Sequence, residues 1–149
     1  MNTLVMGIGN PILTDDGVGI KIAQHIKQEK PELDVIETSE AGLALLDHMV
    51  DYDRLIIIDS IKTEQGKPGE LFELELKDLK PTTDFSLSHG VDLAAAFEVG
   101  KGLGYRMPQS VSIYAVNVEN NTSFGESCTQ NIERRIPLIS RQIIRKEKL

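Results

Sequence analysis

Four polar side chains stand at positions where they could do chemistry. Two adjacent acids, Asp15 and Asp16, follow a stretch rich in turn residues, and Asp59 comes directly after the apolar run 55–58. His89 stands at the end of a long polar stretch. One imidazole and two carboxylates form a mixed nitrogen and oxygen ligand set that suits a borderline divalent metal such as nickel, zinc or ferrous iron. Asp16, Asp59 and His89 are therefore candidate metal ligands.

Each of these residues also has a purely structural interpretation. Aspartate is a favoured N-cap, so Asp15 or Asp16 could cap the helix that follows. Asp59 could be a turn residue before Ser60, and His89 could simply help to start the next helix. The site hypothesis rests on the residues as a set, which requires the first and third strands to be neighbours.

The apolar pattern of the first sixty residues predicts alternating strands and helices. The expected elements are a buried strand over 3–6, a helix from Gly17 that ends at Pro31, a strand over 33–37, a helix over 43–50 and a doubly buried strand over 55–58. This order predicts a parallel α/β sheet with a helix between successive strands. Ligands bind at the carboxyl ends of the strands in such sheets, which is where Asp59 is expected.

The second half of the chain departs from this alternation. Apolar and acidic residues alternate over 71–76, which is typical of an edge strand with one wet face, and we expect it to be antiparallel. The remaining elements expected are a loop over 77–88, a helix over 92–99, a strand over 111–118 and a final helix that begins at a capping box of Ser127 and Gln130 and is kinked or split at Pro137. Residues 1–149 are expected to form a single domain.

Composition excludes several classes of protein. The 149 residues carry a formal net charge of −7, which argues against nonspecific nucleic-acid binding. No apolar run approaches the roughly 18 to 20 residues that span a bilayer, and the N-terminal residues lack a secretion signal, so we expect a cytoplasmic protein without a membrane partner. Cys128 stands alone, which excludes an internal disulfide. Its place before the final helix does not favour a covalent nucleophile.

The glycines near the N-terminus allow a second hypothesis, a nucleotide-binding module. Gly7 and Gly9 follow the first strand, as in the dinucleotide-binding fingerprint. That fingerprint needs a third glycine three positions after the second, where this chain has Ile12, and the next glycine is Gly17. The pattern therefore fits poorly, and we expect no organic cofactor.

Taken together, the motifs resemble those of the hydrogenase maturation proteases, the endopeptidases that trim the C-terminal extension from the large subunit of [NiFe] hydrogenases. The matching segments follow the order and approximate spacing of the family over essentially the whole chain. They are Val5-Met6-Gly7-Ile8-Gly9-Asn10 with Asp15-Asp16-Gly17-Val18-Gly19, then Ile56-Ile57-Ile58-Asp59-Ser60, and then Ser88-His89.

The resemblance implies a fold, a site and a partner. The implied fold is α/β, a three-layer α/β/α sandwich around a twisted, mostly parallel five-stranded sheet with one antiparallel edge strand. The implied metal-binding residues are Asp16, Asp59 and His89, which would probe nickel already inserted in a [NiFe] hydrogenase large-subunit precursor. Nickel would then be carried by the substrate, and cleavage would follow only after loading.

The attacking group is expected to be water. Either a metal polarises it, or a carboxylate acts as general base, for which Asp16 is the candidate. The sequence leaves both routes open. It also leaves open a non-catalytic alternative, a nickel-sensing chaperone for hydrogenase assembly that uses the same three residues without cleaving a peptide bond.

Overall fold

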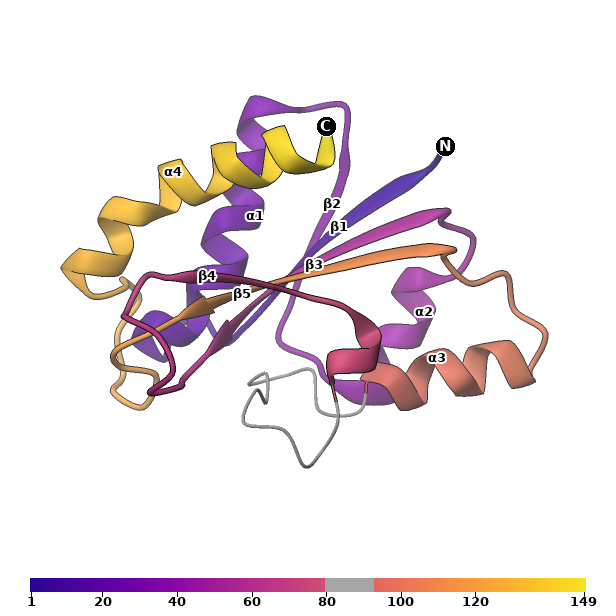
Figure 1. The fold of residues 1–149 in the computed structure, drawn as a ribbon, viewed down its shortest axis with the longest axis horizontal. Coiled ribbons are helices and arrows are strands. Elements are labelled where there is room, and N and C mark those ends of the chain that lie inside the picture. Colours follow the sequence, from indigo (N-terminus) through magenta and orange to yellow (C-terminus); the bar gives the residue numbers. More distant parts are fainter. Residues whose placement is uncertain (80–92) are drawn as a thin grey trace.

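A five-stranded sheet forms the centre of the computed structural model, which describes residues 1–79 and 93–149. The strand order is β2-β1-β3-β5-β4 (Figure 1). All neighbouring strands pair in parallel except β4, which pairs antiparallel with β5 at one edge. The strands are β1 (Thr3–Ile8), β2 (Asp34–Thr38), β3 (Arg54–Ile61), β4 (Leu71–Leu74) and β5 (Ser110–Asn117). The expected mostly parallel sheet, its antiparallel edge strand and the adjacency of the first and third strands are confirmed.

Helices cover both faces of the sheet and make the three layers that the family resemblance implied (Figure 1). The long helices α1 (Val18–Glu29) and α4 (Gln130–Glu147) lie side by side on one face. The other face carries α2 (Leu46–Met49) and α3 (Leu93–Gly102). Within the described ranges no helix is long and apolar enough to cross a membrane.

The position of β3 between two helical layers explains why residues 55–58 are continuously apolar. Ile56 and Ile58 belong to the core between the sheet and the α1 and α4 helices. Leu55 and Ile57 belong to the core on the other face. A strand between two helical layers has no face in contact with water, so every position can be apolar.

Glycines let α1 and the turn before it lie directly against the strand ends. A Cβ atom on Gly19 would stand 2.4 Å from the Ile58 carbonyl oxygen and 2.7 Å from the Ile8 carbonyl oxygen. A Cβ on Gly9 would stand 2.2 Å from the carbonyl oxygen of Asp16. These glycines therefore have a packing role, which accounts for the N-terminal motif without a bound nucleotide.

The second predicted helix, 43–50, is much shorter than expected. The segment is a 3₁₀ turn, Gly42–Leu45, followed by the single turn of α2. Leu43, the first residue of the predicted helix, is 57% exposed. The chain turns to an extended conformation at Val50, so no second turn forms.

The final helix also differs from expectation. Its N-cap is Thr129, not Ser127, and no side chain caps it, so the predicted capping box is wrong. The helix runs unbroken past Pro137. Its apolar stripe, which includes Ile132 and Ile136, is buried against α1 and the sheet, and this burial outweighs the hydrogen bond that proline removes.

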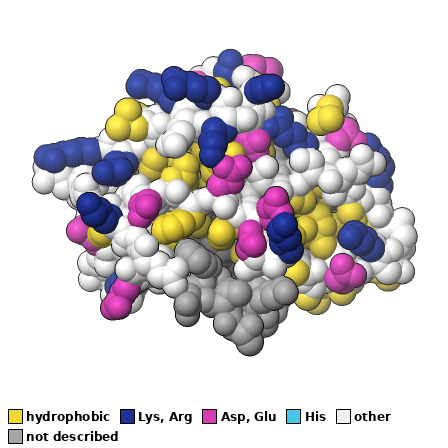
Figure 2. Space-filling model, viewed as in Figure 1, with side chains coloured by type: hydrophobic (Ala, Val, Ile, Leu, Met, Phe, Trp, Pro, Cys, Tyr) yellow, Lys and Arg dark blue, Asp and Glu magenta, His cyan; other side chains and the backbone are white. Residues whose placement is uncertain are grey.

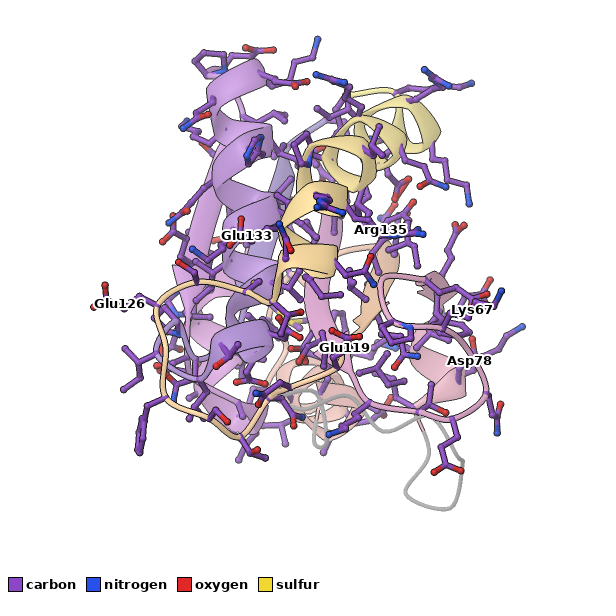
Figure 3. The ribbon with its side chains drawn as sticks, turned by 90° about the vertical axis from the view of Figure 1, so that its left-hand side faces the viewer. Lys67, Asp78, Glu119, Glu126, Glu133 and Arg135 are labelled. Atoms are coloured by element: carbon purple, nitrogen blue, oxygen red, sulfur yellow. The ribbon has the colours of Figure 1, made fainter. Side chains whose placement is uncertain are left out.

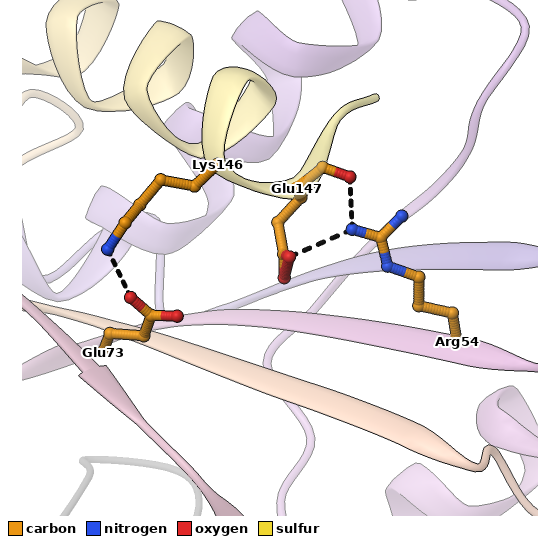
Figure 4. Close-up of polar contacts among 4 residues, drawn as sticks. All are labelled: Arg54, Glu73, Lys146 and Glu147. Atoms are coloured by element: carbon orange, nitrogen blue, oxygen red, sulfur yellow. Dashed lines mark hydrogen bonds and ion pairs between the residues drawn. The ribbon is translucent and has the colours of Figure 1, made fainter.

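The C-terminal end of α4 is tied to the sheet by ion pairs (Figure 4). Arg54 of β3 donates from Nη2 to the Glu147 carbonyl oxygen (2.5 Å) and to Glu147 Oε2 (3.0 Å). Lys146 pairs with Glu73 of β4. Lys and Arg side chains gather over the upper part of the face in Figure 2, where α4 lies. The basic end of the helix is thus partly engaged within the molecule.

Candidate functional site

Asp16 lies in a 3₁₀ turn, Thr14–Gly17, between β1 and α1 and is 5% exposed. The Asn10 amide donates to its Oδ2 (3.0 Å), and the Ser60 hydroxyl donates to its Oδ1 (3.1 Å). Neither bond caps a helix, since the N-cap of α1 is Gly17 and no side chain caps it. The capping interpretation of Asp16 is therefore wrong. Its carboxylate faces the carboxyl edge of the sheet.

Asp59 lies inside β3 rather than after it. The strand continues to Ile61, and Asp59 pairs in register with Ala115 of β5. Its side chain is fully buried, so the turn interpretation is wrong. Because side chains alternate along a strand, Asp59 belongs to the same face as Ile57, whereas Ser60 belongs to the face covered by α1.

Ser60 joins the two carboxylates. Its amide donates to Asp59 Oδ1 (2.7 Å), and its hydroxyl donates to Asp16 Oδ1. The juxtaposition of the two acids expected from the strand order is thus present, with one serine between them. In the sequence Ser60 is only the residue after Asp59, and nothing in the pattern indicates that it bridges the two carboxylates.

The third candidate ligand, His89, lies outside the described residues. Within 1–79 and 93–149 no group of three His, Cys, Asp or Glu side chains could hold a metal ion. Of the three expected ligands, the described residues contain only the two carboxylates, Asp16 and Asp59, which supply oxygen atoms. A three-residue metal site of the expected kind would therefore need a ligand from outside the described ranges.

Asp15 is oriented differently from its neighbour. Its fully buried carboxylate accepts hydrogen bonds from the amides of Glu119 (3.1 Å) and Asn120 (3.0 Å) on Oδ2. On Oδ1 it accepts from the amide (2.6 Å) and hydroxyl (3.0 Å) of Thr129. It caps neither the 3₁₀ turn nor α1. Asp15 fixes the segment between β5 and α4 to the turn that carries Asp16, a role that sequence reasoning missed.

Cys128 lies buried beside this anchor. Burial is the main cause that raises the pKa of its thiol to about 12, and the negative charge of Asp15 adds to the shift. Its Sγ contacts the carbonyl oxygen of Thr14 (3.7 Å). A thiol with such a pKa stays protonated at neutral pH, so Cys128 lacks the thiolate that a covalent nucleophile needs. This agrees with the expectation from sequence.

An open cleft of about 450 Å³ lies beyond the carboxyl ends of β3 and β5. Lys62, two residues beyond Ser60, lines it together with Glu119. Asn117 holds one wall, since it accepts from the Thr63 amide (3.0 Å) and donates to the Thr63 carbonyl oxygen (3.1 Å). In Figure 3, Glu119 lies on the segment that leads from β5 towards α4. The cleft therefore lies beyond the same carboxyl edge of the sheet, although neither Asp16 nor Asp59 is among the residues that line it.

The protein is a three-layer α/β sandwich, a class in which ligands bind at the carboxyl edge of the sheet, and its two buried carboxylates lie at that edge. A family model described as hydrogenase maturation protease matches residues 20–146, which include Asp59 and His89 and begin after Asp16. The chain belongs to the hydrogenase maturation protease family. It is therefore a peptidase that acts in hydrogenase maturation.

Individual relatives agree with this assignment. The chain is 28% identical over 124 residues to the hydrogenase 2 maturation protease of Escherichia coli strain K12, covering 80% of this chain and 75% of that protein. A solution structure of an Escherichia coli endopeptidase is 25% identical, covers 99% of this chain and 94% of its own, and has a TM-score of 0.79. The hydrogenase maturating endopeptidase HybD from Escherichia coli shares the fold at 24% identity, with the same coverage and a TM-score of 0.78.

Proposed function

We propose that this peptidase removes the C-terminal extension of a [NiFe] hydrogenase large-subunit precursor after nickel has been inserted. The observation that carries the proposal is the pair of buried carboxylates, Asp16 and Asp59, joined through Ser60 at the carboxyl edge of the sheet. Membership of the family supports the peptidase activity and the hydrogenase substrate. The proposed reaction takes place in the cytoplasm.

In this proposal the nickel ion belongs to the substrate and serves as the recognition signal. Asp16 and Asp59 supply carboxylate oxygens, and His89 supplies an imidazole, a ligand set that suits a borderline divalent metal. Two carboxylates held by hydrogen bonds at fixed positions are oriented before the substrate arrives. A precursor without nickel would lack the group that these residues contact, and so would not be cleaved.

Water is the proposed attacking group, because the thiol of Cys128 is protonated and buried. Two routes to activate the water stay open. In one, the substrate's nickel polarises the water or the scissile carbonyl; in the other, Asp16 removes the proton as general base. The cleft lined by Lys62 and Glu119 would receive the chain on one side of the scissile bond.

The test is the intact mass of the large-subunit precursor from the same genome, incubated with this protein before and after nickel loading. The proposal expects loss of a C-terminal peptide only from the nickel-loaded precursor. Cleavage of both samples would refute nickel as the recognition signal. An unchanged mass in both, with a stable complex on the loaded precursor, would refute proteolysis of that substrate and favour the nickel-sensing chaperone.

A further inference from the structure

Two exposed apolar residues, Ile12 and Phe124, stand on neighbouring backbone segments beside the Asp16 turn. Phe124 is 85% exposed and Ile12 is 49% exposed. Their backbones are paired, because Leu13 and Gly125 form a parallel bridge in which the Gly125 amide donates to the Ile12 carbonyl oxygen (2.9 Å). Ile12 and Phe124 both precede the bridge by one residue, so the two residues stand on neighbouring backbone segments.

The segment that carries Phe124 is held in place by hydrogen bonds on both sides. Before it, Asn120 Oδ1 accepts from the amides of Thr122 (3.2 Å) and Ser123 (3.1 Å). After it, the Gly125 carbonyl oxygen accepts from the Thr14 amide (3.0 Å). The Asp15 carboxylate anchors both ends of the segment. The backbone at Phe124 is therefore held in a defined place, and a backbone that is already ordered reduces the entropy lost when the aromatic side chain binds a partner.

The charges around this pair favour one kind of partner surface. The segment 119–127 carries Glu119 and Glu126, both exposed, and no Lys or Arg (Figure 3). The turn over 10–16 that carries Ile12 has no Lys or Arg either, and its two acids, Asp15 and Asp16, are buried. Apolar side chains on a segment whose exposed charges are two glutamates match an apolar depression rimmed by basic side chains.

The position of the pair identifies the partner. Ile12 precedes Asp16 by four residues and lies in the same connection between β1 and α1. A protein that presents a peptide bond to Asp16 must pass close to this connection. We propose that Ile12 and Phe124 form a docking patch for the hydrogenase large-subunit precursor, which contacts it with an apolar depression rimmed by basic residues. This inference rests on the proposed function for the identity of the partner.

The test compares the affinity of the full-length chain and its Phe124→Ser variant for the nickel-loaded precursor. Because Phe124 is so exposed, we expect the variant to keep the melting temperature. Loss of an aromatic anchor should weaken binding by about tenfold or more. In cleavage assays the same variant should raise KM and leave kcat unchanged, since Phe124 does not lie among the reacting groups.

A matched control removes an exposed aromatic side chain elsewhere. Tyr105 is 47% exposed and precedes β5, so it lies at the opposite edge of the sheet. Tyr105→Ser should bind the precursor as tightly as the unchanged chain. Equal affinity of the Phe124→Ser variant and the unchanged chain would overturn the docking patch, as would equal losses in both variants.

The two proposals fail in distinguishable ways. If the unchanged chain binds the loaded precursor without changing its mass, the proposed cleavage fails, and the Phe124→Ser affinity still decides the docking patch. If the unchanged chain cleaves the precursor and Phe124→Ser has the same KM, the docking patch fails alone. If the unchanged chain does not bind the precursor at all, the assigned partner is wrong and the inference is overturned.

Discussion

The neighbours Asp15 and Asp16 belong to two different regions of the molecule. Asp15 belongs to a loop region, since all of its hydrogen bonds described above come from residues between β5 and α4. Asp16 belongs to the sheet edge, where it accepts from Asn10, two residues after β1, and from Ser60 in β3. Both are buried carboxylates in one 3₁₀ turn, so burial alone does not distinguish their roles.

The kind of donor distinguishes them. Both oxygens of Asp15 face backbone amides, which can only donate. One oxygen of Asp16 faces a backbone amide, and the other faces the hydroxyl of Ser60, which can donate or accept. Asp15 is therefore a structural anchor that needs two acceptor oxygens. At Asp16 an uncharged amide side chain of the same shape can keep these two hydrogen bonds.

The largest effect on activity should follow Asp16→Asn. Its amide can keep both bonds, with Oδ1 accepting from Asn10 and Nδ2 donating to Ser60, so the melting temperature should change little. Cleavage of the nickel-loaded precursor should fall about 100-fold or more, because a general base or metal ligand is lost. The control is Asp53→Asn at the amino edge of the sheet, where the carboxylate pairs with Arg106. That variant should cleave normally; a matching loss of melting temperature and activity in Asp16→Asn would make it a structural residue.

The next largest effect should follow a change in the packing that positions Asp16 and Asp59. Gly19→Ala puts a methyl group 2.4 Å from the Ile58 carbonyl oxygen, so α1 must move away from the sheet. We expect a loss of about 3 kcal/mol in the free energy of unfolding, measured by urea denaturation. Gly102→Ala in α3 is the matched control, because nothing lies within 4 Å of its added methyl group. Equal stabilities of the two variants would refute the close contact at Gly19.

The general architecture was predictable because local patterns carry it. The continuous apolar run at 55–58 predicted a strand between two helical layers, and the alternation at 71–76 predicted the wet edge strand. Strand order then placed Asp16 near Asp59, as the structure confirms through Ser60. His89 lies outside the described residues, so its part in the site stays a prediction.

The errors arose where distant contacts decide the local structure. Asp15 meets its partners more than a hundred residues away in sequence, and no spacing rule connects it to Thr129. The same contact places Thr129 at the start of α4 and defeats the capping box predicted at Ser127. Asp59 was expected after its strand because a carboxylate usually marks the end of an apolar run, but pairing with β5 continues through Ile61.

Asp15→Asn should lower the free energy of unfolding, whereas Asp16→Asn should not. Wherever its Nδ2 group lies, it meets a backbone amide that also donates, so at least one buried donor loses its partner. We expect a loss of about 2 kcal/mol in the free energy of unfolding. Thr129→Val should cost less, because it removes the hydroxyl bond and keeps the amide bond to Asp15. Should Asp15→Asn prove as stable as Asp16→Asn, the division between anchor and reactive carboxylate would be wrong.

The smallest effect on activity should follow treatment of the Cys128 thiol with an alkylating reagent. Cys128 lies in the loop region with Asp15. Burial raises the pKa of its thiol from an ordinary value of 9.0 to about 12, so at neutral pH the folded protein carries no thiolate there. Iodoacetamide at neutral pH should leave the native protein unmodified and fully active, and should modify it after denaturation, as mass spectrometry would detect. Labelling of the native protein with loss of cleavage would instead assign the thiol to the reaction.

The same shift has a defined sign in the stability of the fold. Above pH 9 the unfolded chain loses the Cys128 proton while the folded chain keeps it, so the free energy of unfolding falls as the pH rises towards about 12. Below pH 9 both states are protonated, and this group adds no pH dependence. A Cys128→Ala variant should lack that part of the alkaline loss, whereas cleavage at neutral pH should not change. That result would make Cys128 a probe of the burial of the loop region around Asp15, and it would agree with the proposal that the chemistry takes place at the sheet edge with Asp16 and Asp59.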